Sequence, residues 1–221
     1  MSAIAIVGAG PGLGASLGRV FGSKGFDVAL ISRSQNHLDA LATGLIEVGV
    51  SAEGFTADVA DTASLTAALE AAAARFGRID VLEFSPYAGL ARVNPADVTI
   101  GNLRPAIEEL LYGAVTATQA VLPAMLEAGS GTLLYTTGGG AITPYPFLAT
   151  LNAAQAALRN WVRNLHNTLR DRGVHAATVA VNAMIADIAP AGIPVIAPDH
   201  LAQAYWNLHT RRDHAEIVLP A

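Results

Sequence analysis

Short apolar runs rich in β-branched residues alternate with longer helical patterns along the whole chain. The apolar runs predict buried strands at 3–7, 27–31, 51–56, 80–84, 131–137, 175–181 and 216–219. The helical patterns between them lie at 12–23, 35–48, 61–76, 102–126, 147–170 and 199–210. Because strand and helix alternate, we expect an α/β fold with a mainly parallel sheet of seven strands and helices on both faces.

Composition limits the class of protein. The 221 residues are 52% hydrophobic and 14% charged, and no stretch reads as a linker, so we expect one domain over 1–221. A net charge of −5 argues against nucleic acid or anionic lipid as a partner. The chain has no cysteine and no cleavable apolar leader, which predicts a cytoplasmic protein.

The most apolar stretch, residues 176–198, was tested as a membrane span. Asn182 and Asp187 would lie in hydrocarbon, and three prolines interrupt any helix drawn through the stretch. We therefore expect no contact with a membrane.

A glycine-rich loop separates the first predicted strand from the first predicted helix. Glycines at the turn permit close approach of the backbone to a pyrophosphate, whose charge the helix N-terminus favours. The alternative is a plain glycine-rich turn. The residues assigned to cofactor binding here are Gly8, Gly10, Pro11, Gly12, Leu13 and Gly14.

The spacing of Gly8, Gly12 and Gly14 resembles that of the short-chain dehydrogenase/reductase family. The likeness continues in Asp58-Val59 after the third strand and Ala88-Gly89 after the fourth, and in residues 119–125 (QAVLPAM) and 156–158 (AAL). The resemblance implies a doubly wound domain of the Rossmann type with strand order 3-2-1-4-5-6-7, and it implies adenine contacts from Asp58 and Val59.

The residues after the second strand bear on which dinucleotide is bound. Ser32 stands where an acidic residue would bind the ribose 2′-hydroxyl, and Arg33 follows it. A guanidinium pairs with a 2′-phosphate that a carboxylate would repel, so we predict a preference for NADP(H) over NAD(H). The alternative is a solvated arginine at the start of a helix.

Aligned on this family, the chain departs from its catalytic pattern of asparagine, serine, tyrosine and lysine. The four corresponding positions hold Leu110, Gly138, Leu151 and Gln155. The chain's single lysine, Lys24, ends the first helix. Gln155 and Asn182 can still orient the cofactor by hydrogen bonds, but an amide carries no charge to stabilise a phenolate.

Other polar residues are weaker candidates. Tyr145 is a displaced acid, a wall of the substrate pocket or an aromatic plug over the core. Tyr87 either stacks near the cofactor or fills space. Asp187 is explained by a cap or turn as well as by acid–base chemistry. The histidines show no zinc spacing, so we expect no metal.

Residues 183–197 correspond to the substrate lid of the family and are almost wholly apolar. They predict a small apolar organic substrate, or else packing on the core or on another subunit. Helices 102–126 and 147–170 would form the subunit contact of a homo-oligomer, a dimer or tetramer, as the resemblance implies.

These features lead to a hypothesis with two alternatives. We expect an NADP(H)-binding oxidoreductase that transfers a hydride to an acceptor needing no tyrosine acid, such as an imine, an iminium ion or a conjugated double bond. The alternatives are an inert dinucleotide-binding sensor or scaffold, and a cofactor-independent isomerase or cyclase in the same pocket.

Overall fold

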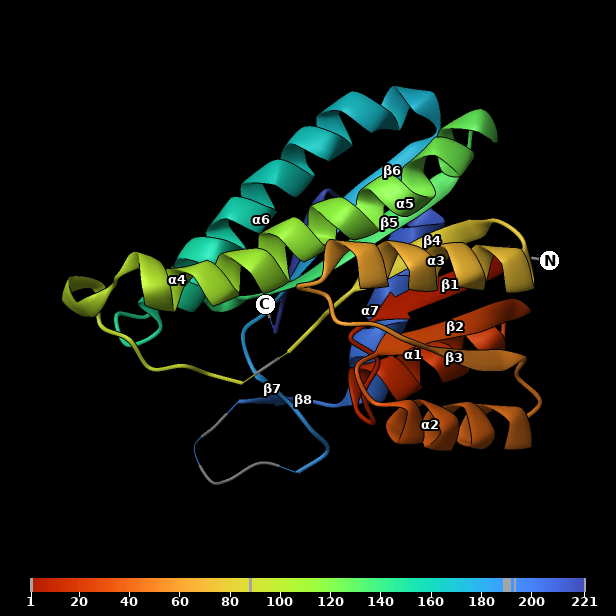
Figure 1. The fold of residues 1–221 in the computed structure, drawn as a ribbon, viewed down its shortest axis with the longest axis horizontal. Helices are drawn as coiled ribbons and strands as arrows, with labels where there is room; N and C mark the ends of the chain where they lie inside the picture. Colours follow the sequence, from red (N-terminus) through yellow and green to blue (C-terminus); the bar gives the residue numbers. More distant parts are fainter. Residues whose placement is uncertain (1, 88, 189–191, 193, 221) are drawn as a thin grey trace.

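The computed structural model describes residues 2–87, 89–188, 192 and 194–220. Its centre is one parallel sheet of seven strands in the order β3-β2-β1-β4-β5-β6-β9 (Figure 1). The strands are β1 (Ser2–Val7), β2 (Phe26–Ser32), β3 (Ala52–Thr56), β4 (Ile79–Phe84), β5 (Gly131–Gly138), β6 (Val174–Val181) and β9 (Glu216–Leu219). The predicted fold class and strand order are confirmed.

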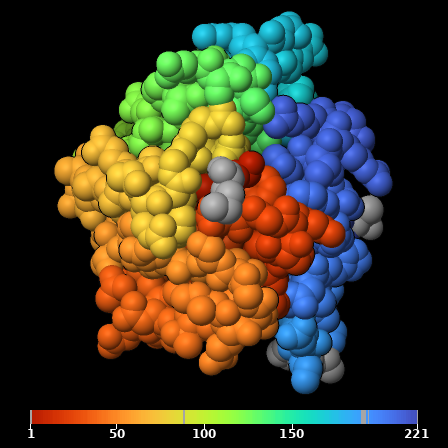
Figure 2. All heavy atoms as spheres, turned by 90° about the vertical axis from the view of Figure 1, so that its right-hand side faces the viewer, coloured from red at the N-terminus to blue at the C-terminus, as the bar shows by residue number. Residues whose placement is uncertain are grey.

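Helices cover both faces of the sheet. One apolar cluster joins the sheet to α3 (Thr62–Phe76), α5 (Gly113–Glu127) and α6 (Ala149–Leu169). The other joins it to α1 (Leu13–Gly22), α2 (Gln35–Glu47) and α7 (Pro198–Arg211). In Figure 2, green residues of α5 lie beside cyan residues of α6, while blue C-terminal residues adjoin the red-orange N-terminal segment. Buried apolar side chains on both faces explain why the strands read as continuous apolar runs.

Local signals set the helix ends. Asp61 caps α3, where its side chain accepts hydrogen bonds from the backbone N–H groups of Ala63 and Ser64 at 3.0 and 3.1 Å. Pro198 occupies the first turn of α7, where a missing N–H costs nothing. Gly77 follows α3 with φ of 86°. These ends agree with the predicted boundaries to within one residue.

The predicted helix over 102–126 is interrupted. The chain forms α4 (Ile100–Ile107), then a π-helical turn (Glu108–Tyr112), then α5. Such turns insert one extra residue and are frequent at functional sites. Short 3₁₀ turns occupy Pro95–Asp97, Gly139–Ala141 and Arg170–Arg172.

A second, two-stranded sheet pairs β7 (Met184–Ile185) with β8 (Val195–Ile196) and was not predicted. The N–H of Met184 donates to the carbonyl of Pro194 at 2.8 Å, and that of Ala186 donates to Ile196 at 3.1 Å. The two ends of the predicted lid are thereby joined. Among the described residues, no helix has the length and apolar character that crossing a membrane demands.

Candidate functional site

The candidate site lies at the carboxyl edge of the sheet, between β1 and β4. β1 has β2 on one side and β4 on the other, so successive connections leave it in opposite directions. Open α/β sheets bind ligands in the crevice at such a switch point. In Figure 1 the arrowhead of β1 points toward the side where β7 and β8 lie.

The glycine-rich loop is shaped by close contacts. Gly8 has φ of 92°, and a Cβ there would come within 2.6 Å of the Pro86 backbone. A Cβ on Gly14 would lie 2.9 Å from Cα of Ala9. At Gly12, by contrast, a Cβ would meet no described atom within 4 Å. The loop therefore packs tightly on β4 and on itself, yet leaves open space beside the N-terminus of α1.

The rest of the loop is fixed by the backbone. The N–H groups of Gly8 and Ala9 donate to the carbonyl of Ile31 at 2.9 and 3.0 Å, which ties the loop to β2. Ala15 donates to Gly10 at 2.9 Å. Pro11 is exposed, whereas Leu13 is buried at 8% exposure. The free space and the start of α1 fit the pyrophosphate of a dinucleotide.

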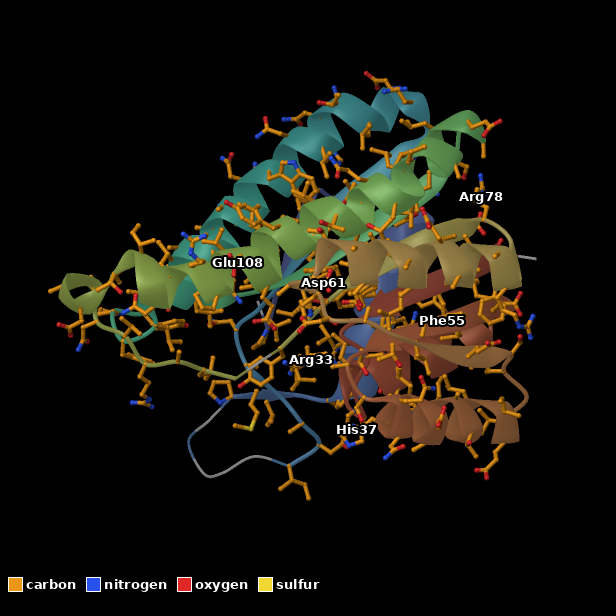
Figure 3. All side chains as sticks on the ribbon, in the orientation of Figure 1. Arg33, His37, Phe55, Asp61, Arg78 and Glu108 are labelled. Atoms are coloured by element: carbon orange, nitrogen blue, oxygen red, sulfur yellow. The ribbon has the colours of Figure 1, made fainter. Side chains whose placement is uncertain are left out.

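Charged groups gather at the ends of β2 and β3. Arg33 is exposed, and Ser32 before it is half-buried. Burial raises the pKa of Glu109, the charge of Arg33 lowers it and that of Asp58 raises it, so these three side chains share one electrostatic environment. Figure 3 shows Arg33 and Asp61 toward the same end of the strands, with Arg78 toward the opposite end.

Val59 packs under the helix that follows the π turn. It is 9% exposed, and a Cβ on Gly113 would lie 2.8 Å from its carbonyl oxygen. Asp58 is exposed, and its carboxylate accepts from the N–H of Ala60 at 3.0 Å. The predicted adenine-side pair thus offers one buried apolar residue and one accessible carboxylate.

The structure brings Gly138 and Gln155 together. A Cβ on Gly138 would lie 3.1 Å from Oε1 of Gln155, which is half-buried on α6. Leu151 is also half-buried, one turn earlier on α6. Leu110 is 6% exposed on the π-helical turn, so it belongs to the core.

Tyr145 and Asn182 also meet at this edge. The Tyr145 hydroxyl donates to Oδ1 of Asn182 at 2.7 Å, and Tyr145 is 38% exposed. A Cβ on Gly139 would collide with the Asn182 side chain. Tyr145 is therefore partly exposed rather than fully buried, and its hydroxyl is held by Asn182.

Asn152 supports this arrangement and was not predicted. Its Nδ2 donates to the carbonyl of Tyr145 at 2.7 Å, which fixes the loop after β5. Its Oδ1 is buried beside Gly140, where a Cβ would collide with it, and it has no hydrogen-bond partner among the described residues. The two glycines, Gly139 and Gly140, thus make room for two asparagine side chains.

Large apolar side chains are exposed on the segments that follow β4, β5 and β6, beyond the carboxyl ends of these strands, and we call them the apolar rim. They are Tyr87, Leu90, Ile142, Tyr145, Phe147, Met184, Ile188 and Val195. Val93 and Leu148 form an isolated parallel bridge, so the loop after β4 is attached to the loop after β5. Arg92 lies over the ring of Phe147, 5.1 Å from its centroid.

The remaining residues predicted for the site make no contact within the described part of the chain that assigns them a role. Tyr87 is 72% exposed, so it fills no internal space, and Asp187 is exposed. Gly89 has φ of 103°. Ala88 and residues 189–191 and 193 of the predicted lid lie outside the described residues. Among the described residues, no three His, Asp or Glu side chains gather as metal ligands would.

Two carboxyl groups at this end of the sheet are not among the residues that the sequence predicts for the site. Glu109 lies within a predicted helix, whose pattern does not set it apart. Glu83 lies in the run Ile79–Phe84 and is fully buried, and burial raises its pKa to about 8. A charged residue inside a strand that is buried on both faces was the available signal.

Comparison with known proteins gives a family match. The family model for short chain dehydrogenases matches residues 2–191. D-threitol dehydrogenase of Mycolicibacterium smegmatis is 38% identical over 130 residues, which cover 58% of this chain and 49% of that protein. The chain thus matches about half the length of this relative. The 2-(S)-hydroxypropyl-CoM dehydrogenase 3 of Xanthobacter autotrophicus is 30% identical over 177 residues, covering 80% of this chain and 69% of that protein.

Solved structures agree in fold. The L-sorbose reductase from Gluconobacter frateurii, complexed with NADPH and L-sorbose, superimposes with a TM-score of 0.86 at 20% identity, covering 95% of this chain and 90% of that one. A metagenomic short-chain oxidoreductase in complex with NADP gives 0.86 at 23% identity, covering 99% and 96%.

Proposed function

The chain belongs to the short-chain dehydrogenase family, and we propose that it is an NADP(H)-binding oxidoreductase with an atypical active site. The observation that carries this proposal is the glycine-rich loop at the switch point, with open space at Gly12 and Gln155 against Gly138 further along the same edge. The loop fits a dinucleotide, while the pocket beyond it lacks the tyrosine and lysine of the usual mechanism.

The loop residues would hold the pyrophosphate, and Asp58 and Val59 the adenine side. Arg33 is the residue to pair with a 2′-phosphate, which supports NADP(H) over NAD(H). The charge of Arg33 acts on Glu109, so the phosphate would compete with a carboxylate for it. Ala88 and Gly89, which come after β4 in the sequence, would also bind the cofactor. Gln155 and Asn182 would orient its nicotinamide end.

The bound cofactor would supply the hydride, and the chain's residues decide what can accept it. Gly138 stands where a serine would polarise a carbonyl but has no hydroxyl, and Gln155 lies against it. Leu151 and Leu110 offer no proton. A hydride added to an iminium carbon gives a neutral amine without a proton donor. A hydride added to a conjugated double bond leaves an enolate, which takes its proton from Tyr145 or from water.

The apolar rim supports a small apolar organic substrate, because such a ligand would cover side chains that are otherwise exposed.

A groove on α5 and α6 is lined by Leu111, Val115 and Trp161, among others, and the exposed Tyr112 borders it. We include in the proposal a homo-oligomer formed through these helices, and a single domain with a lid at about 183–197.

Oxidation of NADPH against a panel of cyclic imines, enones and simple ketones tests this function. We expect turnover of at least one imine or enone, and slow or no turnover of the ketones, because a ketone needs a positioned acid worth roughly 10²- to 10⁴-fold in rate. Binding of NADPH without its oxidation by any compound of the panel would favour the alternative of an inert dinucleotide-binding sensor or scaffold. Turnover without any nucleotide would point to the isomerase or cyclase.

Tyr145→Phe separates the two proton sources. With an enone, loss of the hydroxyl should slow turnover by about tenfold or more if Tyr145 donates the proton. With an iminium substrate the same variant should keep its rate. An unchanged enone rate would assign the proton to water. Tyr112→Phe, which alters a tyrosine at the groove on α5 and α6, is the matched control.

A further inference from the structure

Glu83 is a buried carboxyl group for which the proposed function gives no role. It is fully buried on β4, next to Ile6 of β1 and Leu134 of β5. The Thr136 hydroxyl donates to its Oε1 at 2.9 Å, and the Ser85 hydroxyl donates to its Oε2 at 3.0 Å. No cation pairs with it anywhere in the described part of the chain.

Its surroundings favour the neutral acid. Burial raises the pKa of Glu83 to about 8, although both hydroxyls lower it. Tyr205 of α7 is the nearest further titratable group, with its hydroxyl 2.5 Å from Oγ1 of Thr136, and its own pKa is raised by burial and by Glu83. Hydroxyls both donate and accept, so the same network also serves a protonated carboxyl.

The elements packed around Glu83 carry few other charges, and the titratable residues of α2 on the same face, His37, Asp39 and Glu47, are exposed. β1 has none, and β5 has only Tyr135, whose hydroxyl bonds with Thr118 of α5 on the other face. Arg19 of α1 pairs with Asp199 of α7 at 2.6 Å near the surface. The other titratable residues of α7 are His200 and Arg211, which are exposed, and His209, which bonds with Thr132 at the amino end of β5.

Ser85 connects this acid to the crevice. It follows β4 directly, is partly exposed, and donates its backbone N–H to the carbonyl of Val7 at 2.8 Å. A Cβ on Gly8 would lie 2.7 Å from the carbonyl carbon of Ser85. The carboxyl of Glu83 is therefore one hydrogen bond away from a residue in contact with the glycine-rich loop.

We propose that Glu83 is a proton-uptake site coupled to the crevice: it holds its proton when an anionic dinucleotide occupies the glycine-rich loop and releases it more readily when the loop is empty. This rests on the proposed dinucleotide binding, but not on hydride transfer. A buried negative charge is little screened by solvent, so it disfavours a second anion nearby. By linkage, binding of the anion then raises the affinity of Glu83 for its proton.

Titration calorimetry with NADPH between pH 7 and pH 9 tests the coupling. The 2′-phosphate loses its second proton near pH 6, so the ligand's charge stays nearly constant over this range. With Glu83 ionising at about 8, the affinity should fall by up to about tenfold from pH 7 to pH 9. At pH 8, buffers of different ionisation enthalpy should report uptake of about half a proton per NADPH.

Variants assign the effect to this carboxyl. Glu83→Gln keeps the shape without the ionisation, so its NADPH affinity should not change over that range. Glu70→Gln, an exposed position on α3, should behave as the unmodified protein does. If Glu83→Gln does not fold, Ser85→Ala serves instead: it removes a hydrogen bond to the carboxylate, so the fall in affinity should move to higher pH.

Each outcome decides something distinct. A constant NADPH affinity and no proton uptake in the unmodified protein would overturn the coupling while leaving dinucleotide binding intact. A pH dependence that persists in Glu83→Gln, or does not move in Ser85→Ala, would assign it to another group and also overturn the proposal. Absence of NADPH binding at every pH would end both proposals, whereas proton-coupled binding without hydride transfer would end only the catalytic one.

Discussion

Arg33 is exposed at the end of β2, beside the loop that would hold a pyrophosphate, and its charge reaches Glu109. A guanidinium can form two parallel hydrogen bonds with a phosphate, each stronger than a bond between neutral groups. NADH lacks this phosphate and so gains nothing from the contact. The proposed preference for NADP(H) over NAD(H) therefore depends on this single side chain.

Replacing Arg33 by alanine should weaken NADPH binding by roughly tenfold or more, which corresponds to about 1.4 kcal/mol, and leave NADH binding nearly unchanged. Calorimetric dissociation constants for both nucleotides give the comparison. Arg75→Ala is the control, because Arg75 pairs with Glu53 at 2.7 Å at the far end of α3. An equal loss for NADPH and NADH would contradict the 2′-phosphate role.

Some residues of the site were accessible from sequence and others were not. The glycines were, because close packing and positive φ leave glycine as the natural choice at Gly8. The charge of Glu83 inside a buried strand is visible in the sequence, but its role is not, and neither is that of Asn152. Both roles depend on which side chains other strands and loops place beside them. Sequence spacing says nothing of such partners.

At the scale of elements, helix ends depend on local capping chemistry. Asp61 satisfies two N–H groups at the start of α3, which the helix itself leaves without partners. α3 in turn packs through Leu65, Ala68 and Leu69 onto the sheet. A loosened first turn therefore affects the core as well as the cap.

Asp61→Ala should lower the free energy of unfolding by about 1 kcal/mol, which lowers Tm by roughly 2–4 °C in a chain of this size. Thermal unfolding followed by circular dichroism provides the measurement. Glu70→Ala, in the exposed middle of the same helix, should change Tm far less. A loss at Glu70 as large as that at Asp61 would show that capping is not the cause.

The elements that were predicted share a strong local signal. The central strands of the main sheet, such as β1 and β6, are continuous, mainly apolar runs, and Asp61 and Pro198 mark helix starts. The π-helical turn at Glu108–Tyr112 changes the hydrogen bonding without changing the apolar pattern. β7 and β8 have two residues each, and they pair only after the fold brings Met184 beside Val195. A segment of two residues has no periodic pattern from which that pairing could be predicted.

The molecule carries three titratable groups with shifted pKa values, and the carboxyl group and the two histidines have opposite effects on stability as the pH changes. Glu83 has its pKa raised to about 8, so the stability it contributes is full below its unfolded value of 4.5 and is lost as pH rises through 8. Burial lowers the pKa values of His175 and His209 to about 4. Their contribution is full above 6.5 and is lost as pH falls through 4.

His175 is 3% exposed and its ring packs against His166, with 5.6 Å between centroids. Thermal unfolding from pH 7 down to pH 4 should therefore show a falling Tm, because the two histidines together take up more protons on unfolding than Glu83 releases. His175→Asn, compared with its own Tm at pH 7, should show a smaller fall. The same fall in both proteins would place the acid sensitivity elsewhere.

We propose that the loop between β1 and α1 binds a phosphorylated nicotinamide dinucleotide. A calorimetric titration of the intact chain with NADPH at pH 7 tests this binding independently of any turnover. We expect saturable binding at one site per chain, with a dissociation constant in the micromolar range. A titration with no heat of binding, together with an unshifted Tm at high NADPH concentration, would contradict it.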